Sequence, residues 1–383
     1  MRKLTALLLA LLLLLPAALA EEDDDDDYLI SDILEEVMLE EDGSEIPVEP
    51  ESDEEEDGSV LLTLTFTGDF TIGKDNGWNA RRGTRKNADI FTPEMDKHGG
   101  DINFIMQNVK DILTADDMTL INFEGTLTTS TFIPNNKKTN EFIFSAPPEW
   151  VSVLPDNGVE AVSLENNHIM DHGEEAYEDT KAALRDAGIV YSNSTEMGVF
   201  TVKGVDICML SYLCIDRYES LWDKVPADIR AAKEIYPIVI VSFHWGNEKD
   251  YAPTSNQKKM GRLAVDAGAD LVIGHHSHRI NPIECYNGVY ICYSLGNFCF
   301  CGNSKPSDMN SFIFQTRFRK RDGEITNEGF RIIPIRISSQ KKVNDFIPTP
   351  HTDVTAIDSV ISTLKSNGRK LTYAVDEYPL EWK

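Results

Sequence analysis

Residues 270–278 of this chain read Asp-Leu-Val-Ile-Gly-His-His-Ser-His, so a short apolar run leads directly into a cluster of histidines. A short run of Leu, Val and Ile is typical of a strand that is buried on both faces of a sheet. The stretch therefore predicts a β-strand over residues 270–273 whose carboxyl end delivers His275, His276 and His278. Because ligands of open α/β sheets bind outside the carboxyl ends of the strands, we expect these histidines at a ligand-binding edge.

Four further apolar runs share this design, since a polar residue follows each of them. The runs cover residues 60–66, 118–122, 159–164 and 238–243, and the polar residues are Asp69, Glu124, Asn167 with His168, and His244. Segments with helical periodicity lie between the runs, at residues 105–113, 174–186 and 260–267. Strands that alternate with helices favour an α/β architecture.

Strand-like runs continue beyond the histidines and predict a second sheet. They cover residues 289–295, 311–317 and 330–337, and a last helix is expected over residues 357–364. The predicted fold class is therefore α/β, a sandwich of two mixed β-sheets flanked by helices. We expect one folded domain over residues 59–340 and a C-terminal extension over residues 341–383 that packs on it.

The histidines of the chain gather at these strand ends. Six of the eight lie in or beside them, namely His168, His172, His244, His275, His276 and His278. Each signal alone has a plain structural alternative, since a lone histidine can be structural and Asn-Asn-His can cap a helix. Agreement among five strand ends favours a site where carboxylate, amide and imidazole groups bind divalent ions such as Mn, Fe or Zn. Such ions can activate water and hold both oxygens of a phosphoryl displacement.

The first 58 residues differ from the rest in composition. Arg2 and Lys3 precede an apolar run over residues 4–15 and the small-residue pattern Ala18-Leu19-Ala20, which predicts a secretory signal peptide over residues 1–20. Residues 21–57 hold 21 acidic residues and no Lys or Arg, out of a net charge of −28 for the chain. We expect residues 21–58 to form a disordered acidic linker. A secreted, cell-surface protein follows, with the signal retained as a membrane anchor as the open alternative.

Six cysteines, all beyond residue 200, leave the redox state open. An exported protein can form disulfides. However, Cys292, Cys299 and Cys301 lie in strand-like apolar stretches, and no pair has C-x-x-C spacing. We favour buried free thiols.

Six motifs occur in an order that resembles one known family. They are Gly68-Asp69, Asn122-Phe123-Glu124-Gly125, Asn166-Asn167-His168 with Asp171 and Gly173, His244-Trp245-Gly246, Gly274-His275-His276-Ser277-His278 and Tyr293-Ser294-Leu295-Gly296-Asn297-Phe298. This order resembles the bacterial CapA family, the capsule and poly-γ-glutamate synthesis proteins of the metallophosphatase superfamily. The resemblance covers roughly residues 61–302. It implies a four-layer αββα sandwich, an extracytoplasmic location and a role in making or exporting an anionic surface polymer.

The resemblance also implies roles for individual residues. The metal-ligand positions are matched by Asp69, Glu124, Asn167, His244, His276 and His278. His168 matches the histidine that contacts the phosphoryl group, and Asp171 is placed to orient it. The superfamily usually opens with Asp-x-His, whereas this chain has Asp69-Phe70-Thr71, and Glu124 stands where many relatives have Asp. One or two divalent ions are therefore expected.

These residues favour a metal-dependent hydrolase of the phosphoesterase type, with His168 stabilising charge or protonating the leaving oxygen. Two long loops add basic residues where an anionic polymer or a phosphorylated small substrate could dock, namely Arg81, Arg82, Arg85, Lys86, Lys137 and Lys138. The alternative is a non-catalytic, polymer-binding scaffold. Membrane-bound polymer synthesis or export proteins are the expected partners, and the acidic composition argues against nucleic acid.

Overall fold

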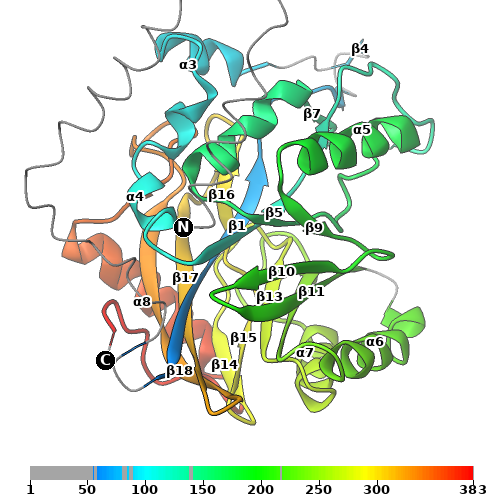
Figure 1. Cartoon of the computed structure of the whole chain (residues 1–383). Helices are drawn as coiled ribbons and strands as arrows, with labels where there is room; N and C mark the ends of the chain where they lie inside the picture. Colours follow the sequence, from blue (N-terminus) through cyan, green and yellow to red (C-terminus); the bar gives the residue numbers. More distant parts are fainter. Residues whose placement is uncertain are drawn as a thin grey trace, which may run out of the picture. The chain divides into compact units, whose positions relative to one another are not determined.

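The computed structural model describes residue 55 and residues 58–79, 84–85, 89–137, 141–215 and 218–382. The predicted signal peptide and almost all of the predicted acidic linker lie outside these residues. The described part is built on two large β-sheets with helices on their outer faces (Figure 1). Within it, no helix combines the length and apolar character needed to span a bilayer.

The first sheet has eight strands and is mixed. Its path is β19-β18-β17-β1-β5-β8-β9, and β16 pairs with β1 beside this path. The strands are β1 (Val60–Thr71), β5 (Met118–Phe123), β8 (Ala161–Ser163), β9 (Val190–Ser192), β16 (Asn297–Phe300), β17 (Asn310–Arg321), β18 (Glu324–Arg336) and β19 (Thr349–Pro350). Strands β1, β5, β8 and β9 are parallel neighbours, so their carboxyl ends share one edge. Strands β17, β18 and β19 add antiparallel pairs.

The second sheet has six strands in the order β10-β11-β12-β13-β15-β14. They are β10 (Gly198–Val202), β11 (Val205–Cys214), β12 (Ile238–Trp245), β13 (Leu271–His275), β14 (Ile283–Tyr286) and β15 (Val289–Cys292). Strands β11, β12, β13 and β15 are parallel, and the two edge strands are antiparallel. The loops contain two small sheets. One pairs β2 (Lys74–Asp75) with β7 (Phe144–Ala146) and β7 with β6 (Thr126–Leu127), and the other pairs β3 (Trp78–Asn79) with β4 (Thr84–Arg85).

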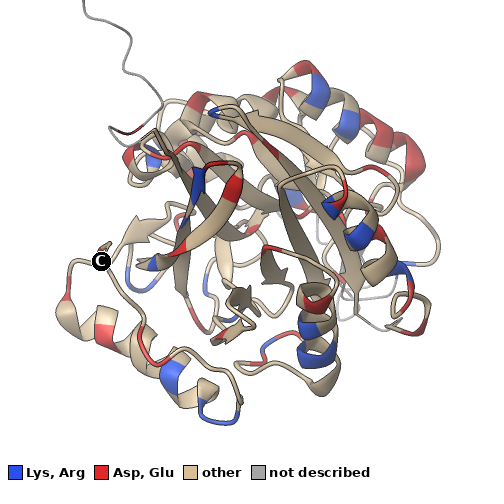
Figure 2. Ribbon diagram, turned by 60° about the horizontal axis from the view of Figure 1, so that its bottom comes forward, with Lys and Arg blue, Asp and Glu red and all other residues tan. Residues whose placement is uncertain are grey.

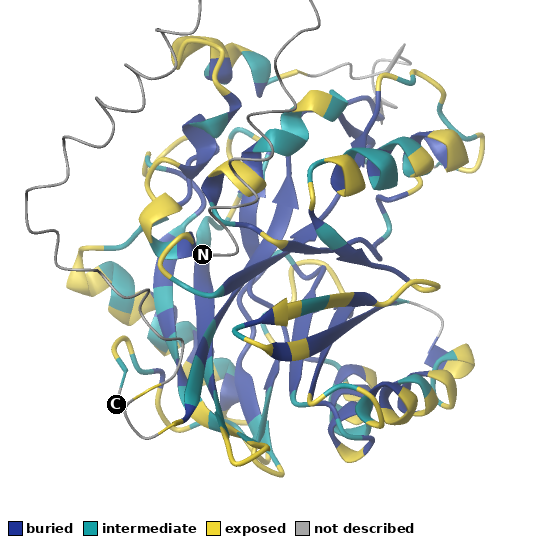
Figure 3. Ribbon diagram, in the orientation of Figure 1, coloured by how far each residue is buried: buried dark blue, intermediate teal, exposed yellow. Residues whose placement is uncertain are grey.

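Alternation along the strands produces the layers. In β12, Ile238 and Ile240 face a core between the two sheets, whereas Val239, Val241 and Phe243 face the outer helices. The inner core also takes apolar residues from β1, β5, β11 and β13, so the sheets pack face to face. Helices α6 (Lys224–Lys233) and α7 (Ser255–Asp266) cover the second sheet, and α5 (Gly173–Asp186) with short helical segments covers the first. The central strands of both sheets are therefore buried (Figure 3), and the predicted four-layer sandwich of two mixed sheets is confirmed.

Two predicted elements differ from the structure. The helix predicted over residues 105–113 is a 3-10 helix, η1 (Ile102–Met106), followed by a single turn, α4 (Lys110–Leu113). Val109 between them has φ −126°, which interrupts helical geometry, and Ile105, Met106 and Val109 are fully buried. The strand predicted over residues 289–295 ends at Cys292, because the chain leaves the second sheet there and returns to the first as β16.

Sequence patterns had indicated no element between residues 189 and 237, where the structure has β9, β10, β11 and α6. Strands β10 and β11 form a hairpin whose turn residues, Lys203 and Gly204, have φ of 46° and 73°. Positive φ at both central positions is the geometry of a type I′ turn, which matches strand twist. Lys at the first of these positions is an uncommon choice, so the turn carries a weak sequence signal.

Residues beyond 340 contact both sheets. The terminal helix α8 (Val354–Gly368) contributes Val360 and Leu364 to the core between them. After α8, the backbone N of Val375 donates to Ile283 O in the second sheet, and the N of Ile332 in the first donates to Pro379 O. All six cysteines have free thiols, and all but the half-buried Cys285 are buried.

Candidate metal centre

The predicted site residues meet at the shared edge of the two sheets. Asp69 lies in β1 opposite Asn122 of β5, and His244 lies in β12 opposite His275 of β13. Glu124 directly follows β5 and is 1% exposed. These positions come from strands of different sheets, which the face-to-face packing brings to one place.

Two glycines let the strands approach closely enough. A Cβ on Gly68, beside Asp69, would lie 2.0 Å from the carbonyl oxygen of Gly296. A Cβ on Gly274, beside His275, would lie 2.2 Å from the carbonyl oxygen of Tyr293. Neither distance is tolerable for a larger residue, so these glycines are required by the packing of the site.

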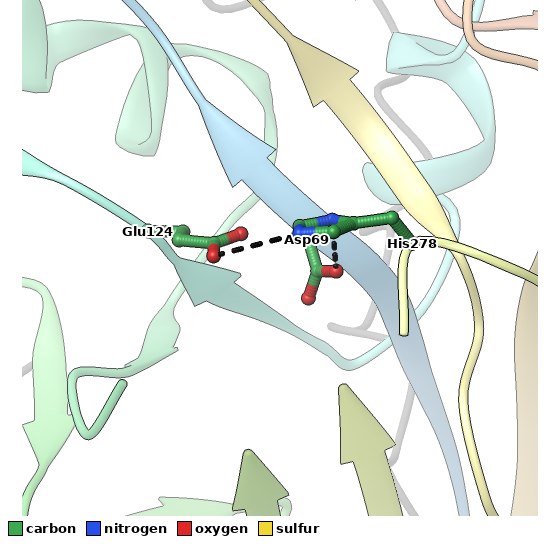
Figure 4. A group of neighbouring side chains, drawn as sticks. All are labelled: Asp69, Glu124 and His278. Carbon is green, nitrogen blue, oxygen red and sulfur yellow. Dashed lines mark ion pairs between the residues drawn. The ribbon is translucent and has the colours of Figure 1, made fainter. Parts of the chain in front are cut away.

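Asp69, Glu124 and His278 form the centre of the cluster (Figure 4). One ligand atom of each lies within 4.8 Å of the others. His278 Nδ1 is 3.0 Å from Asp69 Oδ2 and 2.9 Å from Asn297 Oδ1, while its Nε2 is 4.0 Å from Glu124 Oε1. His276 and His278 both have positive φ, 88° and 51°, a conformation that non-glycine residues rarely adopt and that is common at functional sites.

Glu124 is surrounded by imidazole nitrogens. Its Oε1 lies 3.7 Å from His244 Nε2, 3.8 Å from His168 Nε2 and 4.0 Å from His278 Nε2. These separations are too long for hydrogen bonds. Two donors that share one ion at roughly 2.0–2.2 Å from each are separated by at most about 4.4 Å, so the distances suit an ion held between them.

Several buried oxygen and nitrogen atoms of the cluster that could bind a metal ion have no hydrogen-bond partner among the described residues. They are Asn122 Oδ1, both carboxylate oxygens of Glu124, Asn167 Oδ1, His244 Nε2, His276 Nδ1 and His275 Nε2. Buried polar atoms are nearly always satisfied, and exceptions point to a water or an ion. Carboxylate oxygen, amide oxygen and imidazole nitrogen together suit Mn, Fe or Zn, so the residues present fit a divalent cation.

Burial and neighbouring charges give the histidines of the cluster different protonation states. Burial raises the pKa of Glu124 to about 7 and lowers the pKa of His276 to about 4. Burial, together with the neighbouring His276, holds the pKa of His244 well below its usual range. For His278, burial opposes the charge, but Glu124 and Asp69 outweigh it and raise the pKa to about 10. His244 and His276 are therefore neutral at pH 7 and present lone pairs, the state that a metal ion requires.

His168 is oriented by Asp171, as the resemblance implies. The Nδ1 of His168 is 2.8 Å from Asp171 Oδ2, which also accepts a hydrogen bond of 2.6 Å from the backbone N of Phe144. The other carboxylate oxygen of Asp171 pairs with Lys137 Nζ. Burial raises the pKa of Asp171, but His168 and Lys137 outweigh this and hold it below its ordinary value. With its Nδ1 on Asp171, His168 directs its Nε2 toward Glu124.

The remaining predicted residues are placed less centrally. His276 contacts His244, with ring centroids 4.7 Å apart. Asn167 lines a cavity of about 750 Å³ beside the cluster. Lys137, predicted as part of a docking surface for an anionic chain, forms an ion pair with Asp171. Of the other basic loop residues, Arg81, Arg82, Lys86 and Lys138 lie outside the described part of the chain, as does the side chain of Arg85.

Two asparagines around the cluster had no predicted role, and His275 was expected only at the ligand-binding edge. Asn122 donates to Asp69 Oδ1 at 2.9 Å and lies 3.4 Å from His244 Nδ1. Asn297 contacts His278, as described above, and His275 Nδ1 is 3.5 Å from Asp69 Oδ1. Asn122 and Asn297 both occur in the six motifs, so their presence beside Glu124 and Gly296 was the available signal.

Comparison with known proteins places the chain in a family. The model of the family described as "Bacterial capsule synthesis protein PGA_cap" matches residues 63–301, which include every residue of the cluster. The chain belongs to this capsule synthesis family. It is 33% identical over 261 residues to the PGA biosynthesis protein CapA of Bacillus subtilis strain 168, covering 63% of each chain. It is 27% identical over 262 residues to the capsule biosynthesis protein CapA of Bacillus anthracis, covering 62% of this chain and 60% of that protein.

The chain thus spans about three fifths of the length of these two family members. Among solved structures, it is similar to a calcineurin-like phosphoesterase, YfkN of Bacillus subtilis, with 15% identity and a TM-score of 0.40. That similarity covers 81% of this chain and 100% of the other. Likeness at this level supports no inference about activity.

Proposed function

We propose that this chain is an extracytoplasmic protein of anionic surface-polymer synthesis or export, of the poly-γ-glutamate or capsule type, with a metal-dependent hydrolase site. Membership of the capsule synthesis family supports the biological role. The observation that carries the hydrolase site is that Asp69, Glu124, His244 and His278 each have a side-chain atom within 4.0 Å of another member of the group. The buried carboxylate oxygens of Glu124 and the Nε2 of His244 have no hydrogen-bond partner among the described residues. The location follows from the predicted signal peptide.

In this proposal, six residues would hold one or two divalent ions, namely Asp69, Glu124, Asn167, His244, His276 and His278. A bound ion would supply Lewis acidity toward a phosphoryl or acyl oxygen and lower the pKa of water. Asn122 fixes the Asp69 carboxylate and Asn297 fixes the His278 ring, so both ligands are held in place. Outer partners of this kind set ligand orientation.

His168 acts on the substrate side of the cluster. Its Nδ1 is held by Asp171, so its Nε2 can stabilise negative charge on the reacting group or give a proton to the leaving oxygen. The ring of Phe144 lies 4.9 Å from the ring of His168 and shields that face from water. Burial lowers the pKa of His168, but Asp171 and Glu124 outweigh it and raise the pKa, so the acid form is available near neutral pH.

One observation favours a second function, a non-catalytic scaffold that binds polymer. Thr71 stands where the superfamily usually has a histidine, and it is 1% exposed, with its hydroxyl unpartnered among the described residues. One imidazole fewer weakens the case for a full pair of ions. The chain would then act only by binding the polymer and the membrane-bound proteins that synthesise or export it. Acidic and basic residues occur together on several helices, which gives a surface of mixed charge for such contacts (Figure 2).

The two functions are separated by turnover. The purified chain is assayed on a generic phosphodiester with added Mn²⁺, beside His168→Gln and a matched control, His98→Gln, which changes a histidine outside the cluster. We expect turnover that falls by roughly 10²–10⁴-fold in His168→Gln and is unchanged in His98→Gln. Turnover that is absent, or equal in all three proteins, would favour the scaffold.

A further inference from the structure

The cavity beside the metal centre is large enough for part of a substrate. Its volume is about 750 Å³, within the range of small-molecule sites. It lies among loop residues 134–137 with Glu141, the turn after β8, and the end of β11. Asn167 belongs to its wall, and the unpartnered Oδ1 of this residue is a proposed metal ligand. A ligand can therefore extend from the metal centre into the cavity.

Lys137 and Glu141 also line the cavity, but the buried carboxylate of its wall belongs to Glu165. This residue is 9% exposed, and one of its oxygens accepts a hydrogen bond of 2.8 Å from the backbone N of Ser194. No Lys, Arg or His in the described ranges forms an ion pair with it. The cation nearest in the lining, Lys137, is engaged by Asp171. A carboxylate held this way favours a cationic group and repels an anionic one.

Another part of the lining is apolar. Ile169, Met170, Leu213 and Ile215 contribute to it, and Met170 is 37% exposed, the exposure of a side chain that a ligand could cover. Aliphatic walls suit the methylene groups of a flexible chain. The lining thus combines a surface for an alkyl stem with one buried carboxylate.

We propose that this cavity binds the ammonium-bearing end of a peptidic chain, with the ammonium paired to Glu165 and the methylene groups against Met170 and Leu213. The carboxylates of the same chain, including the one beside this ammonium, then extend toward the metal centre. The inference rests on the proposed function for the identity of the chain, a glutamyl polymer, whose amino terminus is its single cationic group. The site thereby distinguishes the amino end of the polymer from its interior.

Calorimetric titration of the purified full chain tests this assignment without requiring turnover. The probes are a γ-linked glutamate pentamer with a free amino terminus and the same pentamer N-acetylated, so that only the cation differs. A hydrogen-bonded charge pair lost on acetylation corresponds to at least about tenfold weaker binding in the native chain. In Glu165→Gln, which keeps an acceptor for the N of Ser194, we expect the two probes to bind within about twofold of each other.

The matched control is Glu234→Gln, an exposed glutamate next to α6, which should retain the full preference for the free amine. Equal binding of both probes to the native chain, a preference that persists in Glu165→Gln, or no binding of either probe would overturn the inference. Glycerophosphoethanolamine, which carries the ammonium of a lipid headgroup, is expected to bind more weakly than the free-amine pentamer. If it binds more tightly, the assignment to a peptidic chain is wrong. Because these binding measurements require no turnover, their failure would not contradict the proposed hydrolase, which the phosphodiester assay tests separately.

Discussion

Replacing Lys137 by Met probes the support of His168 most sharply, because Met keeps most of the apolar stem of the side chain and removes the ammonium group. Lys137 Nζ lies 2.5 Å from Asp171 Oδ1, and the two side chains are 15% and 0% exposed. Removing one partner of a buried pair typically costs about 3–5 kcal/mol when the other charge is left alone. Asp171 would still hold His168 Nδ1 and the N of Phe144, so we expect a smaller loss of about 1–3 kcal/mol in the free energy of unfolding.

Urea denaturation at pH 7 measures this loss, with Lys305→Met as the control at an exposed lysine. The control should change stability by less than about 0.5 kcal/mol. Lys137→Arg should recover part of the loss, since it restores the charge. In the proposed hydrolase, Lys137→Met should lower kcat more than it raises KM, because Lys137 acts through Asp171 and does not bind substrate. A stability change in Lys137→Met no larger than that of the control would refute the reasoning.

Three further outcomes are expected. Adding Mn²⁺ or Zn²⁺ at a hundred times its Kd to chelator-treated protein should stabilise the fold by about 2.7 kcal/mol, seen as a rise in Tm, whereas no rise would argue against a folded-state site. The pKa of His168 is raised in the folded state, so its contribution to stability is present below the unfolded pKa of about 6.5 and is lost as pH rises through the folded pKa. With a chelator present, the difference in urea midpoint between the native chain and His168→Gln should therefore shrink from pH 6 to pH 9. Gly68→Ala should cost about 3 kcal/mol, because its Cβ would lie 2.0 Å from Gly296 O, and a circular-dichroism melt that matches the native one would contradict this packing.

The sandwich could be predicted from sequence because its strands carry a local signal. The runs leading to Asp69, Glu124, His244 and His275 are largely buried and rich in apolar residues, so they can be recognised without tertiary information. Elements whose secondary structure depends on tertiary packing were harder to predict. The segment around Val109 has helical spacing, yet its burial on a crowded face favours a 3-10 helix and a separate turn.

The candidate site shows the same division. Residues that end strands could be found from their position in the sequence, and they converge in the structure. The contacts that support them could not be predicted from the sequence. The pairs Lys137–Asp171 and Asn297–His278 join segments whose proximity depends on how the loops fold over the sheets. Charge on a loop indicated a surface for anions, but the fold uses Lys137 to hold a buried carboxylate. Only the three-dimensional packing distinguishes these uses.

Elemental analysis of the purified chain addresses the metal centre most directly. Inductively coupled plasma mass spectrometry on protein exchanged into metal-depleted buffer should find one or two equivalents of Mn, Fe or Zn per chain, and Asp69→Asn should lose most of this metal while Glu234→Gln retains it. Metal at buffer background in the native chain, or metal that is undiminished in Asp69→Asn, would contradict the account.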